Sequence, residues 1–283
     1  LALPTLTTDS LDIYLHSLHL RAQMDRLDAS FEANIRGGLD SLWVNQMELV
    51  FRNQQLFYGN ISVYHPTQLD SLYIFANCKN LYCNDDLLQD LLSQLQMKSV
   101  HLPPAIKNLG HLHYHGDIKG RIEHLYLNGL FRTELGNINV NGDMQSDTTL
   151  QNFDFCGHVS SPNFKVGKML DYNDLGDVTF HAHIDGKVDS LQFKECIAEV
   201  NLREIEYRGY TYKDVHFDGQ MTTEQLNGSL KINDENIQLE LKGLADWSKE
   251  DTRMDIAARI DELRPEAIHL TEKYPNMSIS TAA

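Results

Sequence analysis

The stretch from Leu175 to Trp247 reads LGDVTFHAHIDGKVDSLQFKECIAEVNLREIEYRGYTYKDVHFDGQMTTEQLNGSLKINDENIQLELKGLADW. Val178, Phe180 and Ile184 alternate with polar residues, and the same period of two returns around Leu230 and Leu241. A period of two places every second side chain on one face of a β-sheet. The stretch therefore predicts an antiparallel meander with one apolar face and one polar face.

The same alternation continues on both sides of this stretch. Short polar turns separate the candidate strands at 11–20, 26–35, 42–51, 56–64, 71–77, 111–120, 123–133, 136–144, 150–159 and 252–260. Strands at this spacing are typical of an all-β meander. Glycines recur inside the strands, which favours a bent sheet, because bends and bulges accommodate glycine. We expect a mainly β fold, a long antiparallel meander curled into an open β-groove.

Two helices are expected beside the sheet. Asn84 can cap the first, over about 84–97, and leucines at helical spacing from Leu87 to Leu95 give it an apolar stripe. A second, short helix is expected near 265–273, with Pro265 close to its first position. We divide the chain into a β-meander with a capping helix (1–108) and a continuing β-groove segment (109–283), which together could form one continuous domain.

Composition limits the possible partners. The chain has 283 residues and a formal net charge of −16, and it contains no basic run, so nucleic acid is not expected as a partner. No stretch approaches the ~18 apolar residues of a transmembrane helix. The chain begins with Leu1 inside patterned sequence, and we interpret it as an internal piece of a longer protein. Cys78 and Cys83 could pair, although free thiols are favoured over a disulfide.

Histidines are the most tempting candidates for chemistry. His111, His113 and His115 share one strand face, as do His181 and His183. Neighbours at i and i+2 on a strand lie nearly 7 Å apart, too far to chelate zinc without help from another strand. Their neighbours Tyr114 and Ala182 fit the buried face, which places the histidines on the polar face. We expect no metal site and no cofactor.

Enzyme motifs are not found in the sequence. It has no G-x-S-x-G, H-E-x-x-H, P-loop or G-x-G-x-x-G pattern. Asp234-Glu235-Asn236 fits a tight turn between two strands and has too few ligands for calcium. The aromatic group of Tyr207, Tyr210 and Tyr212 fits cross-strand packing better than a sugar or peptide site. We expect a protein that is not an enzyme.

Several motifs in a fixed order resemble the AsmA-like/TamB superfamily, in the form found in Bacteroidetes. They are the pattern from Leu102 to Ile138, then FCGHVSSPNFKVGKML, LGDVTF, YRGYTYKDVHFDG, LNGSLKINDENIQLELKG and the closing DELRPEAIHLTEKYPNMSIS. The residues given most weight are Tyr207, Gly209, Tyr210, Tyr212, Gly219, Gly228, Asp234 and Gly243. The resemblance covers most of the chain and is strongest after residue 80.

The resemblance implies a function. TamB-like proteins (translocation and assembly module) carry an N-terminal inner-membrane anchor and a C-terminal end that reaches an outer-membrane TamA/BamA-type barrel protein. Between these ends a β-taco, or repeating β-groove, with an apolar lining spans the periplasm. The family is linked to phospholipid transport and to outer-membrane protein assembly. This chain would then be a periplasmic groove segment lacking both ends, with phospholipid acyl chains as its ligand.

The predicted lining residues all come from the opening stretch. They are Val178, Phe180, Ile184, Phe217, Leu230, Ile232, Leu239 and Leu241. Two alternatives stay open. The first is a scaffold that presents strand edges to barrel strands by β-augmentation. The second is a β-sandwich binding or scaffold module of a secreted or surface protein, in which a second sheet would close the apolar face.

Overall fold

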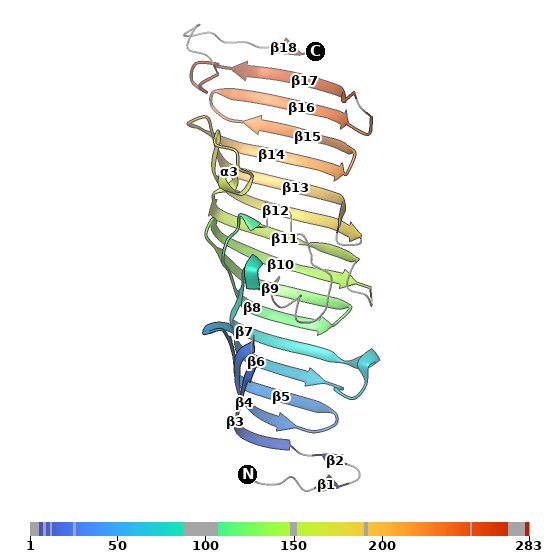
Figure 1. Cartoon of the computed structure of the whole chain (residues 1–283). Coiled ribbons are helices and arrows are strands. Elements are labelled where there is room, and N and C mark those ends of the chain that lie inside the picture. The colour runs from blue at the N-terminus through green and yellow to red at the C-terminus, as the bar shows by residue number, and fades with distance from the viewer. Residues whose placement is uncertain are drawn as a thin grey trace. The chain divides into compact units, whose positions relative to one another are not determined.

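A computed structural model of the chain is mainly β, with 74% of the residues that it describes in strands (Figure 1). It describes residues 6–7, 10–11, 13–24, 27–87, 107–147, 152–189, 192–249, 251–270 and 281–282. The strands form an antiparallel sheet that is not closed into a barrel. The predicted fold class is confirmed.

The chain divides into two compact units, and within each the sheet order follows the chain order. The first unit contains β3 (Ile13–Met24), β4 (Leu27–Gly37), β5 (Ser41–Phe51), β6 (Gln54–Tyr64), β7 (Tyr73–Cys83), β8 (Leu112–Arg121) and β9 (His124–Thr133). The second contains β11 (Phe153–Phe164), β12 (Leu175–Asp189), β13 (Gln192–Tyr207), β14 (Tyr210–Thr222), β15 (Gln225–Asn233), β16 (Ile237–Asp246), β17 (Arg253–Leu263) and β18 (Thr281–Ala282).

The division does not follow the predicted boundary at residue 108. That position lies between β7 and β8, which are hydrogen-bonded neighbours in the first unit. The strand β10 (Gly136–Ser146) is itself divided, with residues 136–139 assigned to the second unit and 140–146 to the first. The remaining strands, β1 (Leu6–Thr7) and β2 (Ser10–Leu11), pair only with each other.

Short connections explain why the strands form a meander. Only Arg208 and Gly209 separate β13 from β14, and both have positive φ angles, 51° and 75°. Two such residues form a type I′ turn, whose twist matches that of the flanking antiparallel strands. Arg208 is also held from outside the hairpin, because its Nε donates to Asp174 Oδ2 at 2.9 Å. The turn fixes the register so that Tyr207 lies opposite Tyr210.

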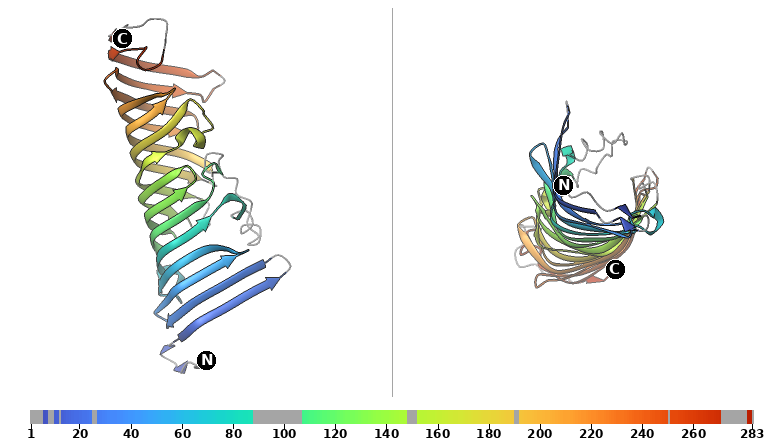
Figure 2. Two further views of the ribbon diagram at one scale, coloured as in Figure 1. Left: turned by 90° about the vertical axis from the view of Figure 1, so that its left-hand side faces the viewer. Right: turned by 90° about the horizontal axis from the view of Figure 1, so that it is seen from below.

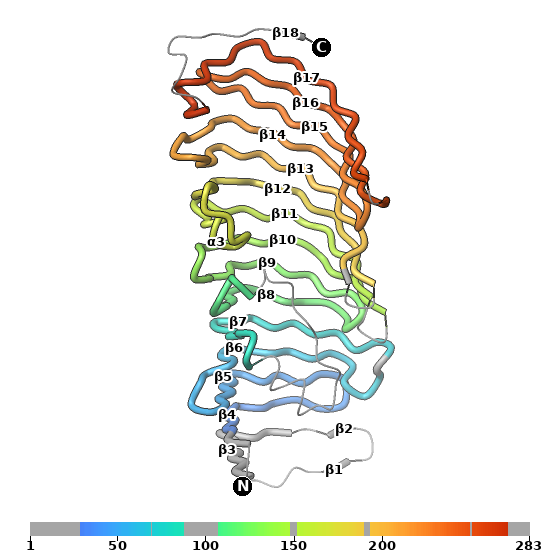
Figure 3. The backbone as a smooth tube through the Cα atoms, turned by 45° about the horizontal axis from the view of Figure 1, so that its top comes forward, coloured from blue at the N-terminus to red at the C-terminus, as the bar shows by residue number. Residues whose placement is uncertain are grey.

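The sheet of the second unit is bent along its strands. Figures 2 and 3 show strands of this unit curving along their length instead of running straight. A bulge accompanies the bend, because the register between β12 and β13 shifts between Thr179 and Phe180. Asp214 on β14 has a φ angle of 50°, a local irregularity that leaves the register with β13 unchanged. A bulge adds a residue to one strand and increases the local twist, so it bends the sheet.

Each unit has its own small hydrophobic core. In the second unit Tyr212, Val215, Ile237 and Ile268 are buried together. In the first unit Phe57, Ala76, Cys78 and Tyr114 form one cluster. A second cluster there contains Phe51, Leu56 and Tyr82. Because these clusters are small, most of the apolar side chains of the sheet lie outside a closed core.

Helices are few and short among the described residues. The predicted first helix begins as expected: residues 85–87 are helical, and Leu87 N donates to Asn84 Oδ1 at 2.8 Å, which is an N-cap. The remainder of that helix, 88–97, lies outside the described residues. Two further helices have both ends within the described residues, η1 (Leu69–Ser71) and α3 (Val166–Met169).

The helix expected near 265–273 is a single turn over its described part, 265–270. Leu270 N donates to Pro265 O at 2.8 Å and His269 N donates to Glu266 O at 3.1 Å. His269 has a φ angle of 59°. This pattern is a Schellman motif, which ends a helical turn. Residues 271–273 of the predicted helix lie outside the described residues.

None of the four cysteines forms a disulfide, so Cys78 and Cys83 do not pair. Cys78 is 1% exposed. Burial, with a smaller contribution from Asp117, raises the pKa of Cys78 to about 11. The thiol therefore stays protonated at neutral pH and acts as a core side chain.

Candidate functional site: an apolar sheet face

The register places the predicted lining residues on one face of the second unit. In an antiparallel sheet, directly opposed residues point to the same side. Phe217 on β14 is opposite Leu230 on β15, which is opposite Leu241 on β16. These residues form a continuous apolar row across three strands.

A parallel row runs two residues further along the strands. It contains Phe180 on β12, then Leu202, Val215, Ile232 and Leu239 on the strands that follow. Val178 lies beyond Phe180 on β12, opposite Phe164 and Ile205. Ile184 lies on the same face, further along β12 in the opposite direction from Val178, between Gly157 and Ala198 on the neighbouring strands. The structure therefore brings all eight predicted side chains onto one face.

Most of this face is incompletely covered. Among the eight residues only Val178 is buried, at 5% exposed, and the other seven are half-buried. Three further residues that share the face by register are still more open: Met221 is 41% exposed, Ile256 is 56% exposed and Met254 is 68% exposed. Large apolar side chains with this exposure form an open apolar patch rather than a closed core.

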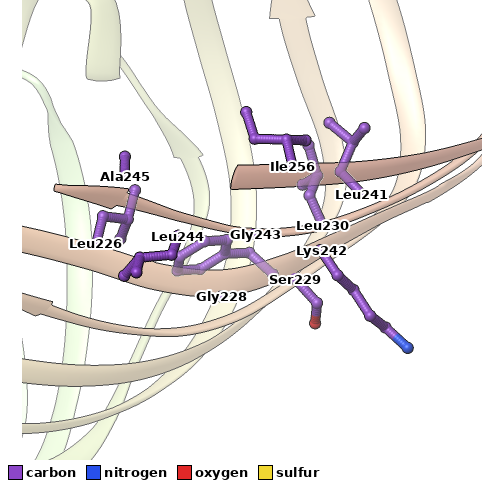
Figure 4. Close-up of a pocket in the computed structure, with 11 residues that line it drawn as sticks. Leu226, Gly228, Ser229, Leu230, Leu241, Lys242, Gly243, Leu244, Ala245 and Ile256 are labelled. Atoms are coloured by element: carbon purple, nitrogen blue, oxygen red, sulfur yellow. The ribbon is translucent and has the colours of Figure 1, made fainter. Parts of the chain in front are cut away.

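A shallow apolar pocket of about 140 Å³ lies on this face (Figure 4). Phe217, Leu230 and Leu241 line one side, and Leu226 and Ala245 line the other. Gly228 and Gly243 lie between the two sides, and Ile256 is at the end. Figure 4 shows the side chains of Ser229 and Lys242 directed away from Leu241 and Ile256, so the interior of the pocket is apolar.

Three paired glycines form the floor of the pocket. Gly219 is opposite Gly228, and Gly228 is opposite Gly243. A Cβ atom on Gly228 would lie 2.7 Å from Asp218 O and 3.0 Å from Gly219 Cα. A Cβ atom on Gly243 would lie 2.5 Å from Asp255 O. The backbones thus crowd toward the apolar face here, and only glycine fits.

The first unit has a comparable apolar face, which our list of lining residues did not include. One row by register joins Phe31, Leu49, Phe57, Leu81, Tyr114 and Phe131 across β4 to β9. A second row joins Met47, Gly59, Cys78, Gly116 and Gly129. Apolar rows beside a glycine row are therefore found in both units.

A sequence signal for the glycine rows exists, but sequence reasoning missed it. An apolar residue, a polar or variable residue and a glycine recur as Phe57-Tyr58-Gly59, Tyr114-His115-Gly116, Phe217-Asp218-Gly219, Leu226-Asn227-Gly228 and Leu241-Lys242-Gly243. The first and third residues of each triplet share the apolar face, because the strand period is two. In several cases the aromatic ring lies over the glycine: Tyr114 atoms are 2.7–2.9 Å from Cβ positions built on Gly129 and Gly116.

The predicted turn at Asp234 holds one end of this face. Asp234 is 3% exposed, and its carboxylate accepts hydrogen bonds from Tyr210 Oη, Lys213 N at 3.0 Å and Asn236 N at 2.9 Å. Burial and the hydrogen bond to Asp234 raise the pKa of Tyr210 to about 12. The carboxylate therefore joins the β15–β16 turn to the start of β14.

The tyrosines near this turn pack together. The rings of Tyr210 and Tyr212 meet edge to face, with centroids 4.8 Å apart. Tyr207, Tyr210 and Tyr212 all belong to the core cluster around Ile237. The ring contact lies within β14, since Tyr210 and Tyr212 are two residues apart on that strand, while Tyr207, on β13, is opposite Tyr210. The three tyrosines pack in the core, as predicted, but the close ring pair is not a cross-strand pair.

His115, His181 and His183 are exposed on the polar face, as predicted. Tyr114, between His113 and His115, is 2% exposed, and Ala182, between His181 and His183, is 6% exposed. His111 and His113 differ from the prediction, because both rings pack on Tyr82, which is 9% exposed and belongs to a hydrophobic cluster. In the part of the chain that the structure describes, no three His, Cys, Asp or Glu side chains are already gathered closely enough to hold a metal ion.

Comparison with known proteins gives no assignment. No protein-family model, no curated protein and no solved structure matches this chain. Within the described ranges, no helix combines the length and apolarity needed to cross a membrane. The function must therefore be argued from the sheet face itself.

Proposed function

We propose that the chain is a non-enzymatic segment whose apolar sheet face shields lipid acyl chains from water. The observation that carries this proposal is the row Phe217–Leu230–Leu241, half-buried beside an apolar pocket of about 140 Å³. Each methylene group that leaves water for such a face is stabilised by about 0.8 kcal/mol. This contribution has no directional requirement, so an acyl chain can occupy many equivalent positions along the rows.

The polar and charged groups of the region suit this role. Leu241 and its neighbour Lys242 point to opposite faces, as do Leu230 and Ser229. A charged group on the apolar face would lose hydration when an acyl chain covers it, at a cost of several kcal/mol. Charges placed on the other face keep the chain in solution and leave the apolar rows free for a ligand.

The second part of the proposal rests on the resemblance to TamB-like proteins. We infer that the segment works in the periplasm, as one part of a longer groove for phospholipid transport between the two membranes or for outer-membrane protein assembly. The partner would be a TamA/BamA-type barrel protein, reached through a part of the parent protein outside this chain. The β-sandwich alternative needs a second sheet over the apolar face, and the described strands of the second unit all belong to one sheet.

Replacement of Leu230 by glutamate tests the proposed acyl-chain site. We expect Leu230→Glu to weaken binding of a fluorescent phospholipid about tenfold, which corresponds to about 1.4 kcal/mol, because a carboxylate would enter the apolar row. The matched control is Asn227→Glu, which adds the same charge to the exposed face of the same strand, β15. Its affinity should remain within about twofold of wild type.

Fluorescence titration of the purified chain measures both affinities, and circular dichroism checks that both variants are folded. No binding by the wild-type chain would refute the proposal. Equal losses in the two variants would also refute it, because binding would then depend on net charge rather than on the apolar face.

A further inference from the structure

Four side chains of metal-ligand type occupy opposed positions on two neighbouring strands of the polar face, away from the acyl-chain site, although their present positions do not bring three of them within reach of one ion. His158 on β11 is directly opposite His183 on β12, and Cys156 on β11 is directly opposite Asp185 on β12. Opposed Cβ atoms lie about 5 Å apart, and successive residues on one strand face lie about 7 Å apart. The four side chains therefore occupy the corners of a small rectangle on two neighbouring strands.

Two contacts link three of these side chains. Cys156 Sγ lies 3.9 Å from His183 Nε2. The rings of His158 and His183 have centroids 4.7 Å apart and are tilted by 42°. Tetrahedral zinc, with bonds of about 2.3 Å to sulfur and about 2.0 Å to nitrogen, separates these two ligand atoms by about 3.6 Å. A shift of a few tenths of an ångström would place Cys156 and His183 at chelating distance.

The neighbouring strand β11 supplies the ligands that β12 lacks on its own. His181 and His183 on one strand are too far apart to chelate alone, whereas His158 reaches His183 from across the β11–β12 ladder. His158, His183 and Asp185 are exposed and Cys156 is half-buried. These side chains can therefore rotate toward a common point without disturbing a packed core.

We propose that Cys156, His158 and His183, with Asp185 as an oxygen ligand, bind a divalent ion of the zinc type on the polar face of the second unit. Thiolate and imidazole together favour zinc over calcium or magnesium, which prefer oxygen ligands. Binding forms a metal–sulfur bond and releases the thiol proton of Cys156 to solvent. The bound ion cross-links β11 to β12 and stabilises this part of the sheet.

The test uses the full chain freed of metal by a chelator, with Co²⁺ as a spectroscopic probe and Zn²⁺ as its competitor. We expect one equivalent of Co²⁺ to give a thiolate-to-cobalt charge-transfer band that Zn²⁺ removes. Cys156→Ser should abolish the band, and His158→Ala or His183→Ala should weaken binding at least about tenfold. Zn²⁺ should also raise the melting temperature of the wild-type chain but not of Cys156→Ser.

Two matched controls separate this site from adventitious binding. Cys196→Ser removes another half-buried thiol, located on the apolar face by its pairing with Gly186 and Met221. His181→Ala removes an exposed histidine from the same face of β12. Both controls should keep the wild-type band and affinity. Absence of a charge-transfer band in the wild-type chain overturns the proposal, and so does equal behaviour of Cys156→Ser and Cys196→Ser.

Discussion

Replacement of Asp234 by alanine should lower the free energy of unfolding of the second unit by about 4 kcal/mol. The buried carboxylate accepts hydrogen bonds from Tyr210, Lys213 and Asn236. A hydrogen bond to a charged group contributes about 1.5–3 kcal/mol, and the three contributions are not additive. Alanine would leave three donors without their acceptor at the end of the apolar face.

Urea unfolding followed by the fluorescence of Trp247, which directly follows β16, measures this effect. Asp218→Ala is the matched control, because Asp218 is an exposed carboxylate on β14, and it should change stability by less than about 0.5 kcal/mol. Asp234→Asn should lie between the two, since the amide oxygen still accepts hydrogen bonds. If Asp234→Ala and Asp218→Ala lose the same stability, the role given to the Asp234 turn is wrong.

Replacement of Tyr114 by alanine should destabilise the first unit by about 3–5 kcal/mol. Its side chain is 2% exposed, packs on Phe131 with ring centroids 4.8 Å apart and lies over Gly116 and Gly129. Truncating a large buried aromatic residue removes its apolar contacts and leaves a cavity that two glycines cannot fill. Trp43 on β5 provides the fluorescence signal for unfolding of this unit.

Two further variants define the cause of the Tyr114 effect. Tyr114→Phe removes only the hydroxyl, which donates to Asp117 O at 2.8 Å, and should cost about 1 kcal/mol. Tyr58→Ala truncates a tyrosine that is 41% exposed and should cost less than Tyr114→Phe. A loss for Tyr58→Ala as large as that for Tyr114→Ala would contradict the assigned core.

Ionisation of Tyr114 also makes the free energy of unfolding of the first unit depend on pH, in a direction that the pKa shift determines. Burial raises its pKa from 10.0 to about 12. A raised pKa means that the folded state holds its proton more tightly than the unfolded state. The stabilisation is therefore fully present below pH 10 and is lost as pH rises toward 12. Tyr114→Phe should lose less stability across this range than the wild-type chain.

Sequence reasoning could predict the strands because their side chains alternate strictly. The period of two in Ile237, Leu239 and Leu241 is enough to assign a face, and the eight predicted lining residues do share one. The cap at Asn84 and the turn at Asp234 were also readable, since each depends on local residues alone.

Contacts that depend on how neighbouring strands pair could not be predicted from the sequence in this way. The row Gly219–Gly228–Gly243 requires β14, β15 and β16 to pair in one particular register, which local sequence does not reveal. A shift of one residue would move each glycine to the other face. The approach of His158 to His183 has the same origin, because the two residues are 25 positions apart and meet only through the pairing of β11 with β12.

The most direct test of the central claim, that the apolar face holds acyl chains, is site-specific photo-crosslinking at two adjacent residues of β16. A benzophenone amino acid is placed at Leu241, on the apolar face, or at Lys242, on the polar face, and the irradiated protein is analysed by mass spectrometry after incubation with phospholipid vesicles. We predict lipid adducts at Leu241 and little or none at Lys242. Equal adducts at the two positions, or none at Leu241, would contradict the claim.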